Sequence, residues 1–271
     1  MTSYRYPNEH AILALTLVLV FAVIAFTAVA TFCGSFLFVL VMLAVSYFMN
    51  RTHHNELIKN AHPVIAQTEP ELAALVKGCA SQLRSPPFRI FIAPGNTLNA
   101  YTFGLVEPQV VVVYAGVLSI MDEDELRFIV GHEIGHICLG HTWLNSLVGG
   151  MAGIPSPYLA AVVLYFSFRW WNRVCEYSAD RAGLLACAKP EKAYSALIKL
   201  VSGSSAVRSP QAWEQALRQI ESEDDHMENN IGELLSTHPM IIRRLEALRK
   251  YAASPDYQYM LARLNAGNPV I

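Results

Sequence analysis

The chain has 271 residues and a formal net charge of -2, with 53% hydrophobic but only 15% charged residues. Soluble domains carry about 25% charged residues, so this composition excludes a disordered chain and indicates a membrane-embedded part. A near-neutral chain also argues against nucleic acid as the main partner.

A long uncharged segment lies near the amino terminus, from Ala11 to Met49. A spanning helix needs about 20 apolar residues, so the segment is long enough for two spans joined by a turn near Cys33–Ser35. A cleaved signal peptide is the alternative, because Ala28–Ala30 resembles a cleavage site, but the apolar run continues beyond it. We therefore predict that residues 1–50 form an N-terminal membrane hairpin of two transmembrane helices.

The charges around this hairpin predict its orientation. Arg5 precedes it, Arg51 and Lys59 follow it, and the turn has neither Lys nor Arg. The positive-inside rule then places both ends in the cytoplasm. The five cysteines are odd in number and include no CxxC pair, which favours a reducing compartment. The expected location is the inner or plasma membrane, with residues 51–271 on the cytoplasmic side and the lipid bilayer as a partner.

Residues 51–271 have the composition of a water-soluble domain. Apolar residues with helical spacing predict a helix from Thr68, as its cap, to about Leu83. The runs 88–93 and 109–114 predict short strands, and 99–104 a further extended segment. Later helices are expected to begin near Lys189–Pro190, Ser209–Pro210 and Thr237. The expected fold is mainly α with a small β-sheet, an α+β architecture.

A helix expected to begin at Asp122, with Glu125 completing a capping box, contains the motif His132-Glu133-Ile134-Gly135-His136. Positions i and i+4 share one helical face, so the two imidazoles can bind one zinc ion while Glu133 reaches a water beside it. Zinc would lower the pKa of that water to about 7, and Glu133 would accept its proton as general base. The alternative is a helix with two incidental histidines, which the apolar flanking residues disfavour.

A catalytic zinc site needs a third protein ligand and an open position. The preferred third ligand is Glu176, because Asp180 lies four residues later and shares its helical face. Glu176 can then bind zinc while Asp180 accepts a hydrogen bond from the free ring nitrogen of a zinc histidine. An ordinary surface helix with two acidic residues is the alternative.

Three other side chains compete with Glu176. Cys138 lies about 200° around the helix from His136, so it points away from the metal. His141 lies about 140° around from His136, and its ring would have to reach back past a turn. Cys175 lies about 100° from Glu176, so only one of the two can face the ion. We predict that His132, His136 and Glu176 hold one Zn²⁺ ion per chain and leave one coordination position open.

Four blocks occur in order between Asn99 and Arg244: residues 99–104, the HExxH motif, residues 176–183, and Thr237-His238-Pro239 followed by Arg244. Together with the apolar hairpin, they resemble the HtpX-like and CAAX-prenyl-protease-like family of membrane zinc metallopeptidases, the gluzincin-type peptidase family M48. The resemblance implies a zincin-like metallopeptidase domain over residues 51–271. It implies a membrane-anchored zinc-dependent endopeptidase that cleaves protein or peptide substrates in membrane or misfolded protein turnover. The chain is too short for the prenyl-protease branch, so CAAX processing is disfavoured.

The resemblance also implies roles for the residues of the two central blocks. His132, His136 and Glu176 would be the zinc ligands. Glu133 would be the general base, and Asp180 would orient a zinc histidine.

The outer two blocks would contribute to catalysis and to substrate binding. Asn99, Ala100 and Tyr101 would border the cleft, where a substrate can add as a β-strand. His238 would be catalytic by stabilising the oxyanion, and Arg244 would brace the site from a helix. From the residues alone, a histidine before a proline is more often a helix cap.

A second uncharged segment runs from Thr142 to Phe168. The metal ligands on the two sides of this segment must meet at one ion, so the segment crosses the membrane either twice or not at all. Two full spans need about 40 residues, and fewer are available here. We therefore predict that residues 142–171 form a membrane-dipping helical hairpin; a hairpin buried inside the domain is the alternative. Trp170 and Trp171 are typical of a membrane–water interface.

Two other functions remain open. An intramembrane zinc protease would bury the HExxH motif in the bilayer, which the charged residues from Asp122 to Arg127 make costly. A non-catalytic membrane scaffold with a structural metal site is the other alternative, which the complete set of ligand and base residues disfavours. The sequence does not determine an oligomeric state.

Overall fold

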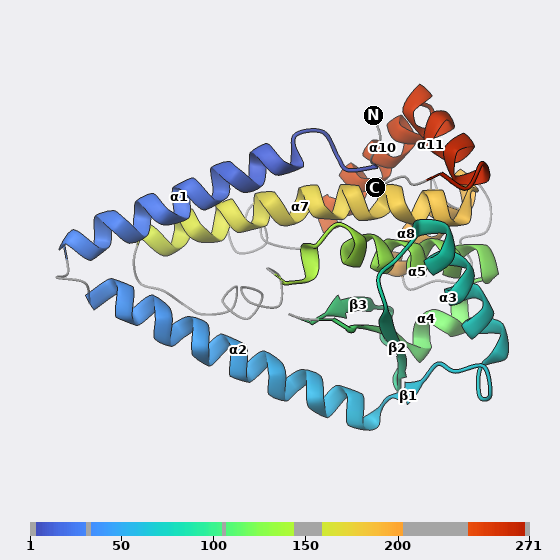
Figure 1. Ribbon diagram of the computed structural model, residues 1–271, viewed down its shortest axis with the longest axis horizontal. Helices are drawn as coiled ribbons and strands as arrows, with labels where there is room; N and C mark the ends of the chain where they lie inside the picture. Colours follow the sequence, from blue (N-terminus) through green and yellow to red (C-terminus); the bar gives the residue numbers. More distant parts are fainter. Residues whose placement is uncertain (1–3, 31–33, 105–106, 144–158, 203–237, 269–271) are drawn as a thin grey trace.

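The computed structural model describes residues 4–30, 34–104, 107–143, 159–202 and 238–268, and Figure 1 shows their arrangement. The described chain is mostly helical with one small sheet, so the α+β prediction is confirmed. The elements are α1 (Glu9–Ala30), α2 (Gly34–Asn60), β1 (His62–Pro63), α3 (Pro70–Leu83), β2 (Phe88–Ala93), β3 (Ala100–Phe103), β4 (Gln109–Tyr114), α4 (Ala115–Ile120), α5 (Glu123–Cys138), α7 (Leu159–Cys187), α8 (Pro190–Ser202), α10 (His238–Ala252) and α11 (Pro255–Asn265).

The sheet has four strands in the order β1-β2-β4-β3. β2 and β4 are parallel, whereas β1 and β3 pair antiparallel with their neighbours. Residues Val110–Val113 of β4 are buried, as expected for a β-branched run at the centre of a sheet. β3 is an edge strand of the described sheet and contacts α5, so one edge of this sheet lies beside the helix that carries the HExxH motif.

The start of α5 is fixed by the predicted capping box. Asp122 accepts a hydrogen bond from the Glu125 backbone N–H, and Glu125 accepts one from the Asp122 N–H. The buried Glu125 carboxylate also accepts bonds from Lys199 Nζ (2.7 Å) and Ser195 Oγ (2.6 Å) on α8. A buried charge pair of this kind needs such additional hydrogen bonds to offset its desolvation, and here they join the start of α5 to α8.

Two glycines allow α5 to approach α7 closely. A Cβ on Gly135 would lie 2.6 Å from Cβ of Ala182, and a Cβ on Gly131 would overlap Ala186. Any side chain at either position would therefore push the two helices apart. This contact sets the distance between the histidines of α5 and Glu176 of α7.

The two amino-terminal helices both contact the rest of the molecule. α1 lies alongside α7 (Figure 1), and Ile12 and Leu13 pack against the buried Trp171 and Cys175. α2 returns toward the sheet, where the ring of His54 stacks on Phe103 of β3 with centroids 3.7 Å apart.

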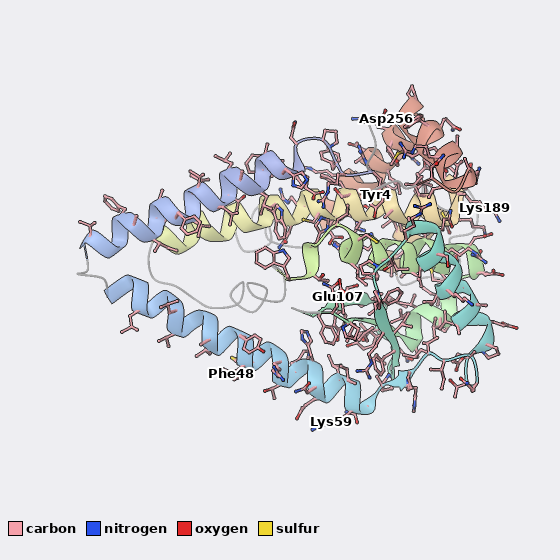
Figure 2. All side chains as sticks on the ribbon, viewed as in Figure 1. Tyr4, Phe48, Lys59, Glu107, Lys189 and Asp256 are labelled. Carbon is pink, nitrogen blue, oxygen red and sulfur yellow. The ribbon has the colours of Figure 1, made fainter. Side chains whose placement is uncertain are left out.

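The outer parts of α1 and α2 expose apolar side chains. Phe21 and Phe26 on α1 are exposed, and so is Phe48 on α2, labelled in Figure 2. In the part of the chain that the structure describes, one segment, Glu9–Phe26, is long and apolar enough to span a membrane. The predicted second span is thus not shown. The predicted boundary at residue 50 falls inside α2, which continues to Asn60.

Several predicted boundaries can be compared with the structure. α8 and α10 begin at Pro190 and His238, next to the predicted starts, whereas position 210 lies outside the described residues. Thr68 was the wrong cap: the N-cap of α3 is Glu69, without a side-chain cap, and Pro70 begins the helix.

The predicted 142–171 hairpin lies partly outside the described residues, because 144–158 are among those not described. The described chain resumes at Leu159 and forms one continuous helix, α7, as far as Cys187. Of the two tryptophans assigned to a membrane interface, only Trp170 is exposed, whereas Trp171 is buried against α1.

Candidate metal centre

A pocket of about 260 Å³ lies between α5, α7, β3 and α10. It combines polar side chains from the HExxH helix with the edge strand of the sheet. Its lining residues are Asn99, Ala100, Tyr101, Thr102, Phe128, Ile129, His132, Glu133, His136, Thr142, Glu176, Leu200 and Arg244.

Three candidate metal ligands meet in this pocket, and their ligand atoms all lie within 4.8 Å of one another. The Nε2 atoms of His132 and His136 are 3.2 Å apart, and each lies 3.5 Å from a carboxylate oxygen of Glu176. Ligand atoms 2.0–2.2 Å from a tetrahedral zinc ion would be separated by about 3.3–3.6 Å. The spacing and the His₂Glu donor set therefore fit a tetrahedral zinc ion that keeps one coordination position open to the pocket.

His132 is oriented by a buried carboxylate behind it. Its Nδ1 lies 3.0 Å from Oδ1 of Asp180. The Asp180 carboxylate in turn accepts two hydrogen bonds from Arg244, at 2.6 Å to Oδ1 and 2.8 Å to Oδ2. Burial opposes protonation of His132, but Asp180 and Glu176 outweigh it and raise the pKa of the imidazole to about 10. A proton and a metal ion therefore compete for His132.

Glu176 is held in its ionised form. Burial raises the pKa of its carboxyl, but Arg244 and the two histidines outweigh this effect and hold that pKa well below its usual range. Arg244 Nη1 lies 3.0 Å from Glu176 Oε2. The same guanidinium thus contacts both Glu176 and Asp180 from α10.

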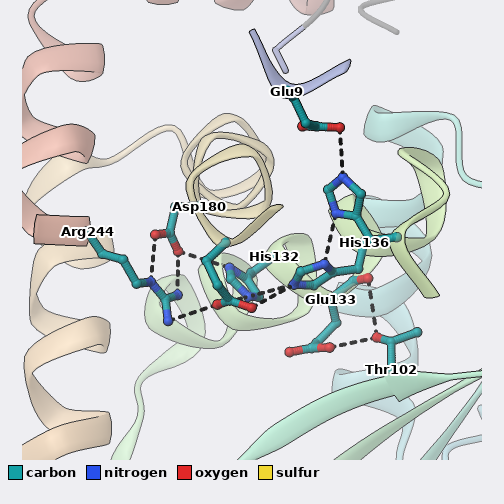
Figure 3. Close-up of polar contacts among 9 residues, drawn as sticks. Glu9, Thr102, His132, Glu133, His136, Asp180 and Arg244 are labelled. Atoms are coloured by element: carbon teal, nitrogen blue, oxygen red, sulfur yellow. Dashed lines mark hydrogen bonds and ion pairs between the residues drawn. The ribbon is translucent and has the colours of Figure 1, made fainter. Parts of the chain in front are cut away.

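Glu133 lies beside the three ligands and is oriented by the sheet. Thr102 on β3 donates a hydrogen bond from Oγ1 to Glu133 Oε2 at 2.6 Å. Figure 3 shows this contact next to the two histidines. The strand that borders the pocket therefore also positions the carboxylate that would act as base.

The other sequence-predicted site residues are distributed unevenly. Asn99, Ala100 and Tyr101 line the pocket from β3 and the residue before it. His238 is the first residue of α10, but its side chain lies outside what the structure describes.

The rival ligands do not join the cluster. Cys138 Sγ donates to the backbone oxygen of Leu83, and Cys175 is buried between α7 and α1. Burial raises the pKa of the Cys175 thiol, which disfavours the thiolate that a metal requires. Neither cysteine is among the clustered residues.

Sequence reasoning missed three residues at this site: Thr102, His141 and Glu9. His141 was considered only as a rival ligand, but its Nδ1 lies 3.0 Å from Nδ1 of His136, on the side away from Glu176. Its Nε2 lies 3.1 Å from Oε1 of Glu9 on α1. The sequence signal for Glu9 is its position just before the uncharged segment that begins at Ala11. An ordinary membrane span does not need an acidic residue at that position.

Comparison with known proteins gives a consistent picture. A family model described as "Peptidase family M48" matches residues 66–252. A "Protease HtpX homolog" from Moorella thermoacetica is 29% identical over 275 residues, covering 86% of this chain and 89% of the relative. Its counterpart in Pyrococcus furiosus is 30% identical over 237 residues, covering 71% and 77%. The "Plastoglobule-localized metallopeptidase 48, chloroplastic" of Arabidopsis thaliana is 25% identical over 194 residues, covering 67% and 56%.

Proposed function

Because the chain belongs to peptidase family M48, we propose that the pocket is the catalytic centre of a zinc-dependent endopeptidase anchored in a membrane. The chain is a membrane-associated metallopeptidase, and its family and relatives favour this function over an intramembrane protease or a scaffold. The observation that carries the proposal is the meeting of three ligand atoms within 4.8 Å, with Glu133 beside them on an open pocket.

His132, His136 and Glu176 would hold the zinc ion. When bound, zinc would polarise the scissile carbonyl and acidify a water molecule. Glu133 would accept the proton of that water and deliver it to the leaving amine. Thr102 keeps the Glu133 carboxylate aimed into the pocket, and His238 is proposed to help stabilise the oxyanion.

The substrate is proposed to bind along β3. This strand is at the edge of the sheet, and Ala100 and Tyr101 on it line the pocket beside the candidate ligands. An extended peptide can pair with a free edge through main-chain hydrogen bonds, which favours unfolded protein segments over compact ones. Turnover of membrane or misfolded proteins is the role that fits such a site.

The membrane anchor is proposed to be the pair α1 and α2, with the catalytic domain on the cytoplasmic side. In Figure 1 the end of α1, the start of α2 and the start of α7 extend toward one end of the molecule, away from the sheet. Exposed Trp143 and Trp170 are residue types found at membrane–water interfaces. Cysteine-labelling probes at both termini should report the cytoplasm; labelling from outside at either terminus contradicts this topology.

The catalytic proposal is tested by purifying the full chain in detergent with zinc and following cleavage of an unfolded protein. Glu133→Gln should retain zinc but lose about 10²-fold or more in turnover, the scale of general acid–base groups. Glu123→Gln makes the same change at an exposed position of α5 and should behave as wild type. Wild-type turnover in Glu133→Gln would remove that residue from the mechanism.

The ligand set needs a separate test. Glu176→Ala should lower zinc occupancy and activity together, whereas Cys175→Ser should preserve both. X-ray absorption of the zinc-loaded protein gives a direct measure, because a sulfur scatterer would appear at about 2.3 Å. Such a scatterer would overturn the His₂Glu assignment.

A further inference from the structure

The first residue of α1 reaches the metal centre through a second imidazole. Glu9 Oε1 lies 3.1 Å from His141 Nε2, and His141 Nδ1 lies 3.0 Å from His136 Nδ1. Glu9 and His141 are 3% and 2% exposed, respectively. Figure 3 shows the chain of contacts from Glu9 through this ring to His136.

The direction of each hydrogen bond follows from the ligand atom of His136. Its Nε2 faces Glu176 and His132, so a neutral, metal-binding His136 must carry its proton on Nδ1. That N–H needs an acceptor, which places a lone pair on Nδ1 of His141. The proton of His141 is then on Nε2 and is donated to Glu9. In this arrangement each N–H group faces an acceptor, and the last acceptor is the Glu9 carboxylate.

We propose that Glu9 and His141 are positioning residues for the metal ligand His136, so that the amino-terminal helix completes the metal centre. The inference rests on the proposed function, because it requires His136 to bind the metal through Nε2. Hydrogen bonds to the free nitrogen of a ligating histidine fix its tautomer and ring orientation and raise its basicity. Here that contribution comes from a helix outside the domain core.

Glu9 is itself held in place by donors from two directions. Ser178 on α7 donates to Oε2 of Glu9, and Arg5 forms an ion pair with Oε1. Ser178 Oγ also accepts a bond from the Tyr6 backbone N–H at 2.8 Å, and Arg181 donates to the Arg5 carbonyl at 3.0 Å. A buried carboxylate with this many partners is fixed and charged, as an acceptor for His141 must be.

The docking of α1 on α7 supports the same conclusion. Ile12 and Leu13 lie one turn beyond Glu9 and pack against Trp171 and Cys175. These contacts are next to Glu176 along α7. Docking of the amino-terminal helix and assembly of the ligand set therefore share one helix, and the two are expected to depend on each other.

The test measures metal affinity in the full-length protein in detergent, by competition with a chelator for Zn²⁺. His141→Phe keeps a ring but removes the acceptor, and it should weaken zinc binding about 10–100-fold, the scale for partners of metal ligands. Glu9→Gln should weaken it about tenfold or more. The exposed neighbour His10 gives the matched control, since His10→Gln should bind zinc as wild type.

A double variant separates a relay, in which Glu9 acts on His136 through His141, from a general loosening of the fold. If Glu9 acts through His141, then Glu9→Gln should cost little further affinity in the His141→Phe background, whereas independent effects would add. Met260→Ala leaves a cavity under α11 and touches none of these contacts, so it should lower thermal stability and leave zinc affinity unchanged. Additive losses, or a loss of zinc affinity in Met260→Ala equal to that in Glu9→Gln, would overturn the relay.

The outcomes distinguish this inference from the proposed function. Failure of the wild-type protein to bind zinc would contradict the function itself. Wild-type binding that is unchanged in Glu9→Gln and His141→Phe would refute only the relay. Unfolding of each variant in excess chelator reports stability without metal, and a loss of affinity in a variant of normal stability supports the relay.

Discussion

The two histidines of the HExxH motif are supported in different ways. His132 contacts a carboxylate directly, and that carboxylate is clamped by Arg244. His136 contacts a second imidazole, and the carboxylate lies one residue further away, on α1. Both arrangements satisfy the same requirement for an acceptor at Nδ1. One does so within the domain, whereas the other depends on a helix at the amino terminus.

The local chain explains this difference. Asp180 is four residues beyond Glu176, so a single helix delivers both a ligand and the partner of His132. On the other side, α5 ends at Cys138, and Gly140 has φ +75°, a conformation that favours glycine. This turn brings His141 back against His136, where it extends the reach of the site to α1.

The largest effect is expected from changing the carboxylate that contacts His132 directly. Asp180→Asn removes the charge that orients His132 and leaves Arg244 with one carboxylate partner. Zinc affinity should fall about 10–100-fold, at least as far as in Glu9→Gln. Chelator competition measures the fall, and Asp124→Asn, which alters a surface pair with Lys189, is the matched control. Equal affinities in both variants would show that Asp180 does not support the ligand.

The pH dependence of zinc binding tests the role of His132 in a second way. His132 has a raised pKa of about 10, so below that pH the metal must displace its proton. Raising the pH removes the competing proton, and apparent affinity should rise about tenfold per pH unit from pH 7 to 9. Titrations at fixed ionic strength measure the slope. A flat profile would mean that His132 does not bind a proton in this range.

Disturbing the shared scaffold should affect both histidines together. Gly135→Ala forces α5 away from Ala182 and should cost about 1–3 kcal/mol of stability by overpacking, with weaker zinc binding. Gly78→Ala is the control, because among the described residues a Cβ there meets only Arg127, at 3.6 Å. A helical Gly→Ala change stabilises by about 0.4–1 kcal/mol where space allows. Chemical denaturation distinguishes them, and equal shifts would refute the close-packing argument.

The smallest effect is expected at a residue that supports neither histidine. Thr102→Val removes the hydrogen bond to Glu133, and a bond of this kind contributes about 1 kcal/mol, or about fivefold in rate. Turnover should fall by that factor while zinc affinity stays at the wild-type value. A parallel loss of zinc would instead assign Thr102 to the support of the ligands.

The sequence by itself determined the relationships that depend on helical periodicity. The i, i+4 pairs His132–His136 and Glu176–Asp180 each lie on one helix, and the capping box at Asp122 formed as predicted. The sheet strands at 88–93 and 109–114 were also predictable, because short apolar and β-branched runs signal themselves locally. The chemistry of the cluster followed from the motif, since residue type and spacing suffice to propose a metal site.

Only the tertiary structure decided what lies behind those residues. Glu9 and His141 are 132 positions apart, and Thr102 is 31 positions from Glu133. No periodicity relates such residues: they meet because Gly135 lets α5 and α7 pack closely, because β3 pairs at the sheet edge, and because α1 docks on α7. Local spacing fixes which side chains share a helical face, but the packing of whole helices and strands decides which distant groups complete their hydrogen bonds.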